Sequence, residues 1–160
     1  MKKLILSIVV CLALQLSFSQ DLIKLDFSDI DSPQFLKNKY LDNFKYLATS
    51  GKVGVAYLQP QDIKIYNKEN TVKLIRVTSN NIEELNTTFT FSDSVEMIII
   101  KISKSNFNLD IIDCSKLAQF KNLKYIYYIY ESEFKKNAKL HTLNCLQLVA
   151  KQYYTKQLPQ

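Results

Sequence analysis

Glycine, histidine and arginine are scarce in this sequence of 160 residues, which contains only Gly51, Gly54, His141 and Arg76 of these types. A phosphate-binding P-loop and a dinucleotide-binding loop both need glycine at several fixed positions, so two glycines exclude both. One histidine excludes metal sites built from several imidazoles and leaves little for histidine-based catalysis. We therefore expect no catalytic residues, no metal site and no cofactor.

The basic charge is carried almost entirely by lysine. The formal net charge is +6, and the lysines are spread along the chain rather than clustered. Proteins that bind nucleic acids favour arginine for paired contacts with bases and phosphates, and it is nearly absent here. This pattern indicates a solvated surface and predicts that nucleic acid is not a partner.

The first residues have the order of a secretory signal peptide. Two lysines are followed by an apolar run over 4–16, and the small residues Ser17 and Ser19 precede Gln20 at the positions that signal peptidases prefer. The run is shorter than the roughly 20 residues that span a bilayer. The sequence therefore predicts a signal peptide over 1–19 and export to the periplasm or the extracellular space.

The remainder of the chain reads as one domain. Hydrophobic residues make up 47% of the sequence, which is typical of a packed core, and no linker-like stretch divides residues 20–160. No later segment is long and apolar enough to span a membrane. We expect a single globular domain without a transmembrane segment in the mature chain.

Two cysteines, Cys114 and Cys145, remain after the predicted cleavage. In an exported protein they are candidates for one disulfide, which would close a loop of roughly 30 residues and contribute about 2–4 kcal/mol. The alternative is two buried thiols, since a domain of this size folds without a covalent link. The sequence leaves both interpretations open.

Apolar periodicity predicts the helices and strands. Ser32 is a natural N-cap and Pro33 a natural first residue for a helix over 33–49, in which apolar residues recur every three or four positions. Similar spacing predicts a short helix within 109–120 and a C-terminal helix over 140–153. Short apolar or alternating runs predict strands over 23–27, 53–58, 63–65, 72–77, 95–102 and 123–130.

One of these strand runs resembles the leucine-rich repeat. Val72, Ile75, Val77, Asn80 and Ile82 occupy the five defining positions of the pattern L-x-x-L-x-L-x-x-N-x-L. In that family the apolar positions point into a stacked core, and the asparagine side chain bonds backbone groups where the chain leaves the strand.

Further frames start at Val53, Val95 and Leu123, so that successive starts lie 19, 23 and 28 residues apart. Repeats of this family span roughly 20–29 residues. Ser103 and Glu131 stand in the asparagine position of the last two frames. The resemblance covers about residues 53–134 and implies stacked parallel strands.

The fold expected from these patterns is α/β. It is a small, mostly parallel, solenoid-like sheet of repeat-like strands, with the helix over 33–49 capping its N-terminal end and the helix over 140–153 at its C-terminal end. The alternative is an α+β fold in which the same strands pair antiparallel and both helices lie on one face. In either case the apolar run over 95–102 indicates a buried middle strand.

The tyrosine-rich run over 123–130 holds the candidate binding residues. Tyr125 and Tyr127 share one face of the predicted strand, where tyrosine on an exposed concave surface would bind peptide or glycan. The preferred interpretation is that one face of this strand is core and the other merely lines the sheet, because tyrosine favours strands.

The preferred function is an exported, non-enzymatic interaction domain whose partner is a protein or glycan of the cell envelope. One alternative is a small envelope hydrolase that uses Cys145 with His141, or a carboxylate pair such as Glu131 and Glu133. A second alternative is an inhibitor or an immunity-type protein.

Overall fold

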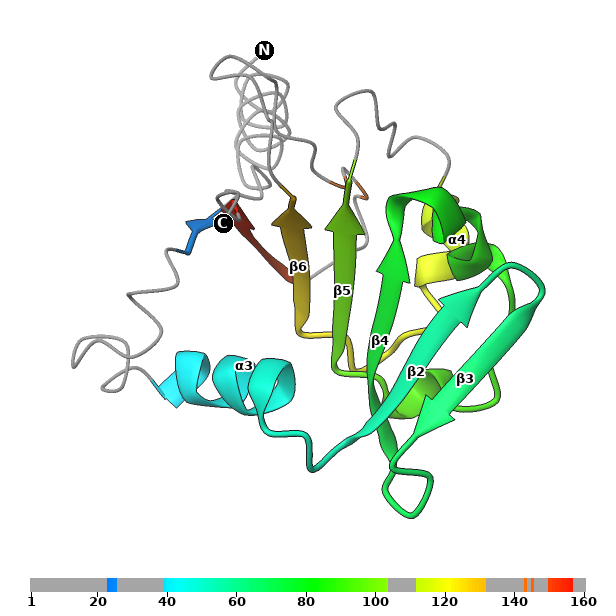
Figure 1. The fold of residues 1–160 in the computed structure, drawn as a ribbon, viewed down its shortest axis with the longest axis horizontal. Helices are drawn as coiled ribbons and strands as arrows, with labels where there is room; N and C mark the ends of the chain where they lie inside the picture. Colours follow the sequence, from blue (N-terminus) through cyan, green and yellow to red (C-terminus); the bar gives the residue numbers. More distant parts are fainter. Residues whose placement is uncertain are drawn as a thin grey trace, which may run out of the picture.

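The computed structural model describes residues 23–25, 39–103, 112–131, 143, 145 and 150–156. These residues form a seven-stranded sheet with short helices on both sides (Figure 1). The elements in chain order are β1 (Ile23–Lys24), α3 (Lys39–Thr49), β2 (Gly54–Gln59), β3 (Asp62–Tyr66), β4 (Val72–Thr78), the 3-10 helices η2 (Ser79–Asn86) and η3 (Ser92–Ser94), β5 (Met97–Ile102), α4 (Cys114–Leu117), β6 (Tyr125–Tyr130) and β7 (Lys151–Lys156).

The sheet is mostly parallel, with the strand order β1-β7-β6-β5-β4-β2-β3. β2, β4, β5, β6 and β7 pair in parallel with their neighbours, β1 pairs in parallel with β7, and only β3 runs antiparallel, as a hairpin with β2. The expectation of an α/β fold with a mostly parallel sheet is confirmed, and the antiparallel alternative is wrong.

The middle strand is β5, whose sequence places apolar side chains on both faces. Five of its six residues are buried, and β4 and β6 pair with it on either side. A parallel strand covered on both faces needs this continuous apolar composition. The predicted buried middle strand over 95–102 is thus confirmed.

The two faces of the sheet carry separate hydrophobic cores. On one face, side chains such as Ile98, Ile126 and Tyr128 pack against residues of η2, α4 and the loops around them. On the other face, Phe44 and Leu47 of α3 pack against the first halves of β4 to β7. Figure 1 shows α3 toward the ends at which β4, β5 and β6 begin. The molecule therefore has three layers, with the sheet between α3 and the η2–α4 side.

The predicted helix over 33–49 is observed as α3 over 39–49, and residues 33–38 lie outside the described part of the chain. Its predicted place as a cap on the N-terminal end of the sheet is wrong. The buried Phe44 ring contacts the rings of Tyr125, Tyr127 and Tyr153, with centroids 5.0–5.5 Å apart, so α3 lies across the sheet face. The apolar stripe of the helix buries more surface there than at a sheet edge.

The predicted C-terminal helix over 140–153 is wrong where the structure describes it, because residues 151–156 form strand β7. Gln152 faces one core while Tyr153 and Thr155 face the other. Burial on both faces and pairing with β6 outweigh the helical spacing read from the sequence. Most of 140–149 lies outside the described residues.

The remaining predicted elements are found at shorter lengths. The strand over 23–27 is described as the two residues of β1, and the helix within 109–120 is α4, at whose start the Asp113 side chain accepts a hydrogen bond from the Ser115 amide at 2.8 Å. A side-chain cap of this kind satisfies an amide that the helix leaves unpaired.

Both glycines occupy backbone positions that other residues would strain. Gly51 has a φ of +61°, which places it in the left-handed region at the end of α3. A Cβ at Gly54 would lie 2.5 Å from the carbonyl oxygen of Asn70, where β2 meets the start of β4. The two glycines therefore allow the backbone to pass from the end of α3 into β2.

A buried polar cluster joins β6, β7 and the segment before β7. The Gln152 side chain donates to the carbonyl of Leu143 at 2.7 Å and accepts from the Leu143 amide at 3.0 Å. The Tyr128 hydroxyl donates to the same Gln152 oxygen at 2.6 Å. Burial raises the pKa of Tyr128, which keeps this hydroxyl protonated and able to donate.

Replacing Gln152 with leucine should lower the free energy of unfolding by about 2–3 kcal/mol, because Leu143 and Tyr128 lose their buried partner. Urea unfolding followed by circular dichroism measures the loss. Tyr128→Phe is the matched control, since it removes one hydroxyl of the same cluster and should cost about 1 kcal/mol. A Gln152→Leu protein as stable as the parent would contradict this account.

Candidate functional site

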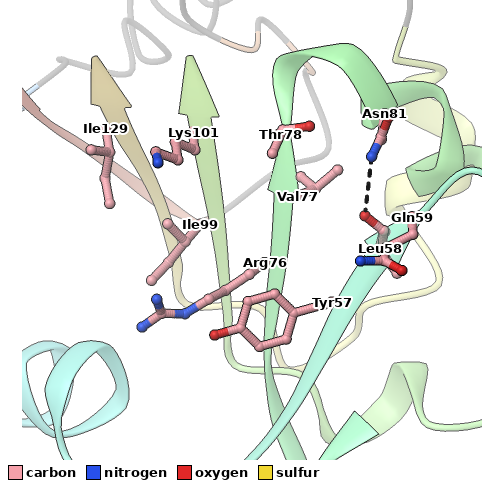
Figure 2. A pocket seen from close by; sticks show the side chains of 10 residues that line it. All are labelled: Tyr57, Leu58, Gln59, Arg76, Val77, Thr78, Asn81, Ile99, Lys101 and Ile129. Atoms are coloured by element: carbon pink, nitrogen blue, oxygen red, sulfur yellow. Dashed lines mark hydrogen bonds between the residues drawn. The ribbon is translucent and has the colours of Figure 1, made fainter. Parts of the chain in front are cut away.

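The second halves of the strands are not covered by α3. Parallel strands bring their carboxyl ends to one edge of a sheet, which is where open α/β sheets bind ligands. At that edge the structure has a hollow of 290 Å³ on the face that α3 covers elsewhere (Figure 2). We call it the carboxyl-end hollow, and its main side chains are Tyr57 and Gln59 from β2, Arg76 and Thr78 from β4, Ile99 and Lys101 from β5, and Ile129 from β6.

Arg76 is the central charged group of this hollow. Its register partner on β2 is Tyr57, and its guanidinium carbon lies 5.9 Å from the centroid of the Tyr57 ring. A guanidinium that lies over an aromatic ring is attracted by the partial negative charge on the face of the ring. Figure 2 shows the two side chains together at the end of the hollow nearest α3.

The guanidinium is only partly satisfied by the protein. Its Nη2 donates to the carbonyl of Ala48 at 3.2 Å, in the last turn of α3. Its Nε is buried and has no hydrogen-bond partner among the residues that the structure describes. Within the described part of the chain, no carboxylate lies within ion-pair distance of Arg76. Arg76 thus has no anionic partner among the described residues and at least one unused donor.

Lys101, the other cation that lines the hollow, has a partner. Its ammonium group forms an ion pair with the carboxylate of Glu131, just beyond the end of β6. Both side chains are partly exposed, so solvent screens this pair. Lys101 nevertheless has a carboxylate partner, and Arg76 is the lining cation without one among the described residues.

An aromatic pair extends the site toward the edge strand. The rings of Tyr57 and Tyr66 meet edge to face, with centroids 5.1 Å apart, and the two residues are 36% and 55% exposed. A second hollow of 250 Å³ shares Arg76 and Tyr57 and is otherwise lined by the end of α3, the start of β2 and the end of β3. Arg76 and Tyr57 therefore stand between two open spaces on the same face.

The chemical groups of the site favour binding. The hollow offers an unpaired guanidinium, an aromatic ring, the apolar side chains Ile99 and Ile129, a hydroxyl at Thr78 and an amide at Gln59. Among the described residues, no three His, Cys, Asp or Glu side chains gather closely enough to hold a metal ion. The arrangement can hold an anionic group next to an apolar one.

Tyr125 and Tyr127 do not have the exposure that a binding role requires, and the preferred interpretation, a core face of the strand, is the one observed. They are only 4% and 3% exposed, because Phe44 of α3 packs edge-on against both rings. Burial raises the pKa of Tyr127 to about 12, and its buried hydroxyl has no hydrogen-bond partner among the described residues. Both tyrosines are core residues, and the exposed part of this face lies further along the strands.

Cys114 and Cys145 are joined by a disulfide, with Cα atoms 5.5 Å apart. The bond links α4 to the segment that leads into β7, and Cys145 is buried. The thiol that the hydrolase alternative needs is therefore not available. His141 and Glu133 lie outside the described residues, and Glu131 is paired with Lys101.

Arg76 and Tyr57 are not among the site residues predicted from the sequence. One signal was present, because the only arginine of a lysine-rich chain is, with Lys73, one of two polar residues within the strand 72–77. Such a placement points the charge at one face of the sheet. Its pairing with Tyr57 depended on the register between β2 and β4, which the sequence does not encode locally.

Comparison with other proteins adds no assignment: no protein-family model matches the sequence, and no curated protein or solved structure is detectably similar to the chain. No helix among the described residues has the length and apolar character needed to cross a lipid bilayer.

Proposed function

We propose that this chain is an exported, non-enzymatic interaction domain that binds a protein or glycan of the cell envelope through the carboxyl-end hollow. The observation that carries the proposal is the end of the sheet face that α3 leaves uncovered, where Arg76 has no carboxylate partner among the described residues and lies against the Tyr57 ring. The leader-like residues 1–19 support export.

A repeat-like origin of the sheet is part of this proposal. The frames that start at 53, 72, 95 and 123 correspond to β2, β4, β5 and β6, which are parallel neighbours in that order. Stacked repeats contact only their neighbours in this way. One departure is that Asn80 is exposed, while the adjacent Asn81 donates to the carbonyl of Leu58 at 3.5 Å.

The disulfide supports binding over the proposed hydrolase, because it removes the nucleophile from the Cys145 and His141 pair. An inhibitor or immunity-type protein would use the same surface, since inhibition is also binding by a rigid site. The carboxyl-end hollow is therefore the place to test for either role.

A photo-reactive amino acid placed at Gln59 should form a covalent adduct with an envelope component in intact cells. Gln59 lines the hollow, so its partner would lie within reach of the probe. The same probe at Lys121 is the matched control, because Lys121 is highly exposed and precedes β6, at the opposite edge of the sheet. Adducts are detected by gel shift and identified by mass spectrometry.

A bulky side chain that fills the hollow tests the same proposed function. Thr78 is exposed in the hollow, so Thr78→Trp should leave the fold intact and lower the adduct yield from Gln59 by about tenfold or more. Absence of an adduct at Gln59, or identical adducts at Gln59 and Lys121, would contradict the proposed function.

A further inference from the structure

We infer that the carboxyl-end hollow recognises a carboxylate attached to an apolar or aromatic group, with Arg76 as the partner of the carboxylate. The inference rests on the proposed function for the position of the ligand and adds its chemical class. The two sources of such a group are the C-terminal end of a peptide whose last residue is apolar, and a small aromatic acid.

The positive charge of the hollow matches one negative charge on a ligand. Arg76 has no carboxylate partner among the described residues, whereas Lys101 is neutralised by Glu131. A carboxylate carries one negative charge, so it compensates Arg76 without leaving a surplus. A doubly charged phosphate would bring a second charge for which the hollow holds no unpaired cation among its described lining residues.

The unused donor of Arg76 favours the same ligand. Its Nε is buried without a partner, which is costly for a charged group. A carboxylate presents two oxygens in one plane and accepts two parallel bonds from a guanidinium. A ligand carboxylate that displaces what covers Nε would accept from Nε and from Nη2, whose N–H lies parallel to Nε–H, and the second Nη2 hydrogen would keep the bond to Ala48.

The apolar part of the ligand follows from the surroundings of the guanidinium. Tyr57 lies beside it, and Ile99 and Ile129 form the apolar part of the same hollow. The volume of 290 Å³ is at the lower end of the roughly 300–1,000 Å³ of small-molecule sites. We therefore expect room for one aromatic or aliphatic group next to the carboxylate.

The single arginine makes a direct experiment available. In ¹⁵N-labelled protein the Nε–H group of Arg76 gives the only arginine side-chain signal of its kind. The probes are acetyl-glycyl-phenylalanine with a free carboxylate and its C-terminal amide, 3-phenylpropionate and its amide, and inorganic phosphate. Each is added to the mature protein at constant pH and salt.

The two free carboxylates should move the Arg76 signal in a saturable manner, and the two amides should not. Tighter binding of the peptide indicates a polypeptide end as the natural source, and tighter binding of 3-phenylpropionate indicates a small acid. Arg76→Lys keeps the charge but loses the planar pair of donors, so carboxylate affinity, followed by calorimetry, should fall about tenfold to a hundredfold.

Two controls separate recognition from general attraction. Lys121→Met removes a positive charge at the opposite edge of the sheet and should leave the affinity unchanged. Tyr57→Leu keeps Arg76 and should weaken both aromatic carboxylates by about tenfold. The backbone amide spectrum of each variant shows whether it is folded, which matters for Arg76→Lys because Arg76 contacts the end of α3.

An Arg76 signal that stays in place with both carboxylates, in folded protein, overturns the inference. Equal shifts with inorganic phosphate, or with the amides, overturn it as well, because the site would not distinguish a carboxylate. Adducts from Gln59 in intact cells would still support the proposed function in these cases. Carboxylate binding without any such adduct would instead support the inferred class of ligand and contradict the proposal of an envelope partner.

Discussion

Replacing Phe44 with alanine should lower the free energy of unfolding by about 3–5 kcal/mol, the range found when a large buried aromatic side chain is removed. Phe44 is fully buried, and its ring contacts three tyrosine rings of β6 and β7. It is the principal link between α3 and the sheet. Its loss leaves a cavity that the neighbouring rings fill only in part.

Urea unfolding monitored by tyrosine fluorescence measures this loss. Tyr46→Ala is the matched control, because Tyr46 lies on the same helix and is 45% exposed, so its removal should change stability by less than about 0.5 kcal/mol. Similar losses in the two variants would mean that α3 does not pack on the sheet through Phe44.

Removing the disulfide has the second largest expected effect. A protein with both Cys114→Ser and Cys145→Ser should lose about 2–4 kcal/mol of unfolding free energy, because a bond across 31 residues no longer restricts the unfolded chain. The buried position of Cys145 adds the cost of placing a hydroxyl in the core.

The measurement is urea unfolding of the parent and of the double variant, each with and without a reductant. The parent should lose stability when it is reduced, and the double variant should not respond. A parent protein whose unfolding midpoint is unchanged by complete reduction would contradict the expected contribution of the Cys114–Cys145 bond.

A strand could be predicted from the sequence where its own pattern of apolar residues reflects how it is buried in the fold. The apolar run of β5 indicated burial on both faces, and the buried position between β4 and β6 follows from it. Parallel pairing was predicted through the spacing of the repeat-like frames. It was not encoded in any single strand, because a short apolar run is compatible with either direction.

The errors arose where tertiary contacts decide between local alternatives. The spacing of apolar residues over 140–153 suits a helix, but β6 offers a strand partner and a core on each face, and β7 forms instead. An exposed face remained an alternative for Tyr125 and Tyr127 because the position of α3 is not visible in the sequence. In both cases the missing information was which element covers which face.

The candidate site was the least predictable part of the molecule. Its residues come from four strands, and only the register of the sheet brings Tyr57 next to Arg76. The composition indicated correctly that arginine is rare here. It did not indicate that the one arginine would keep a buried donor without a partner.

The position of β7 has a consequence for the order of assembly. β7 lies between β6 and β1, although β1 is the first described strand in the sequence and β7 the last. Until β7 pairs with it, β6 is an apolar edge strand of the kind that can pair with other chains. Closure of the sheet therefore waits for the last described strand, and the earliest segment joins only after it.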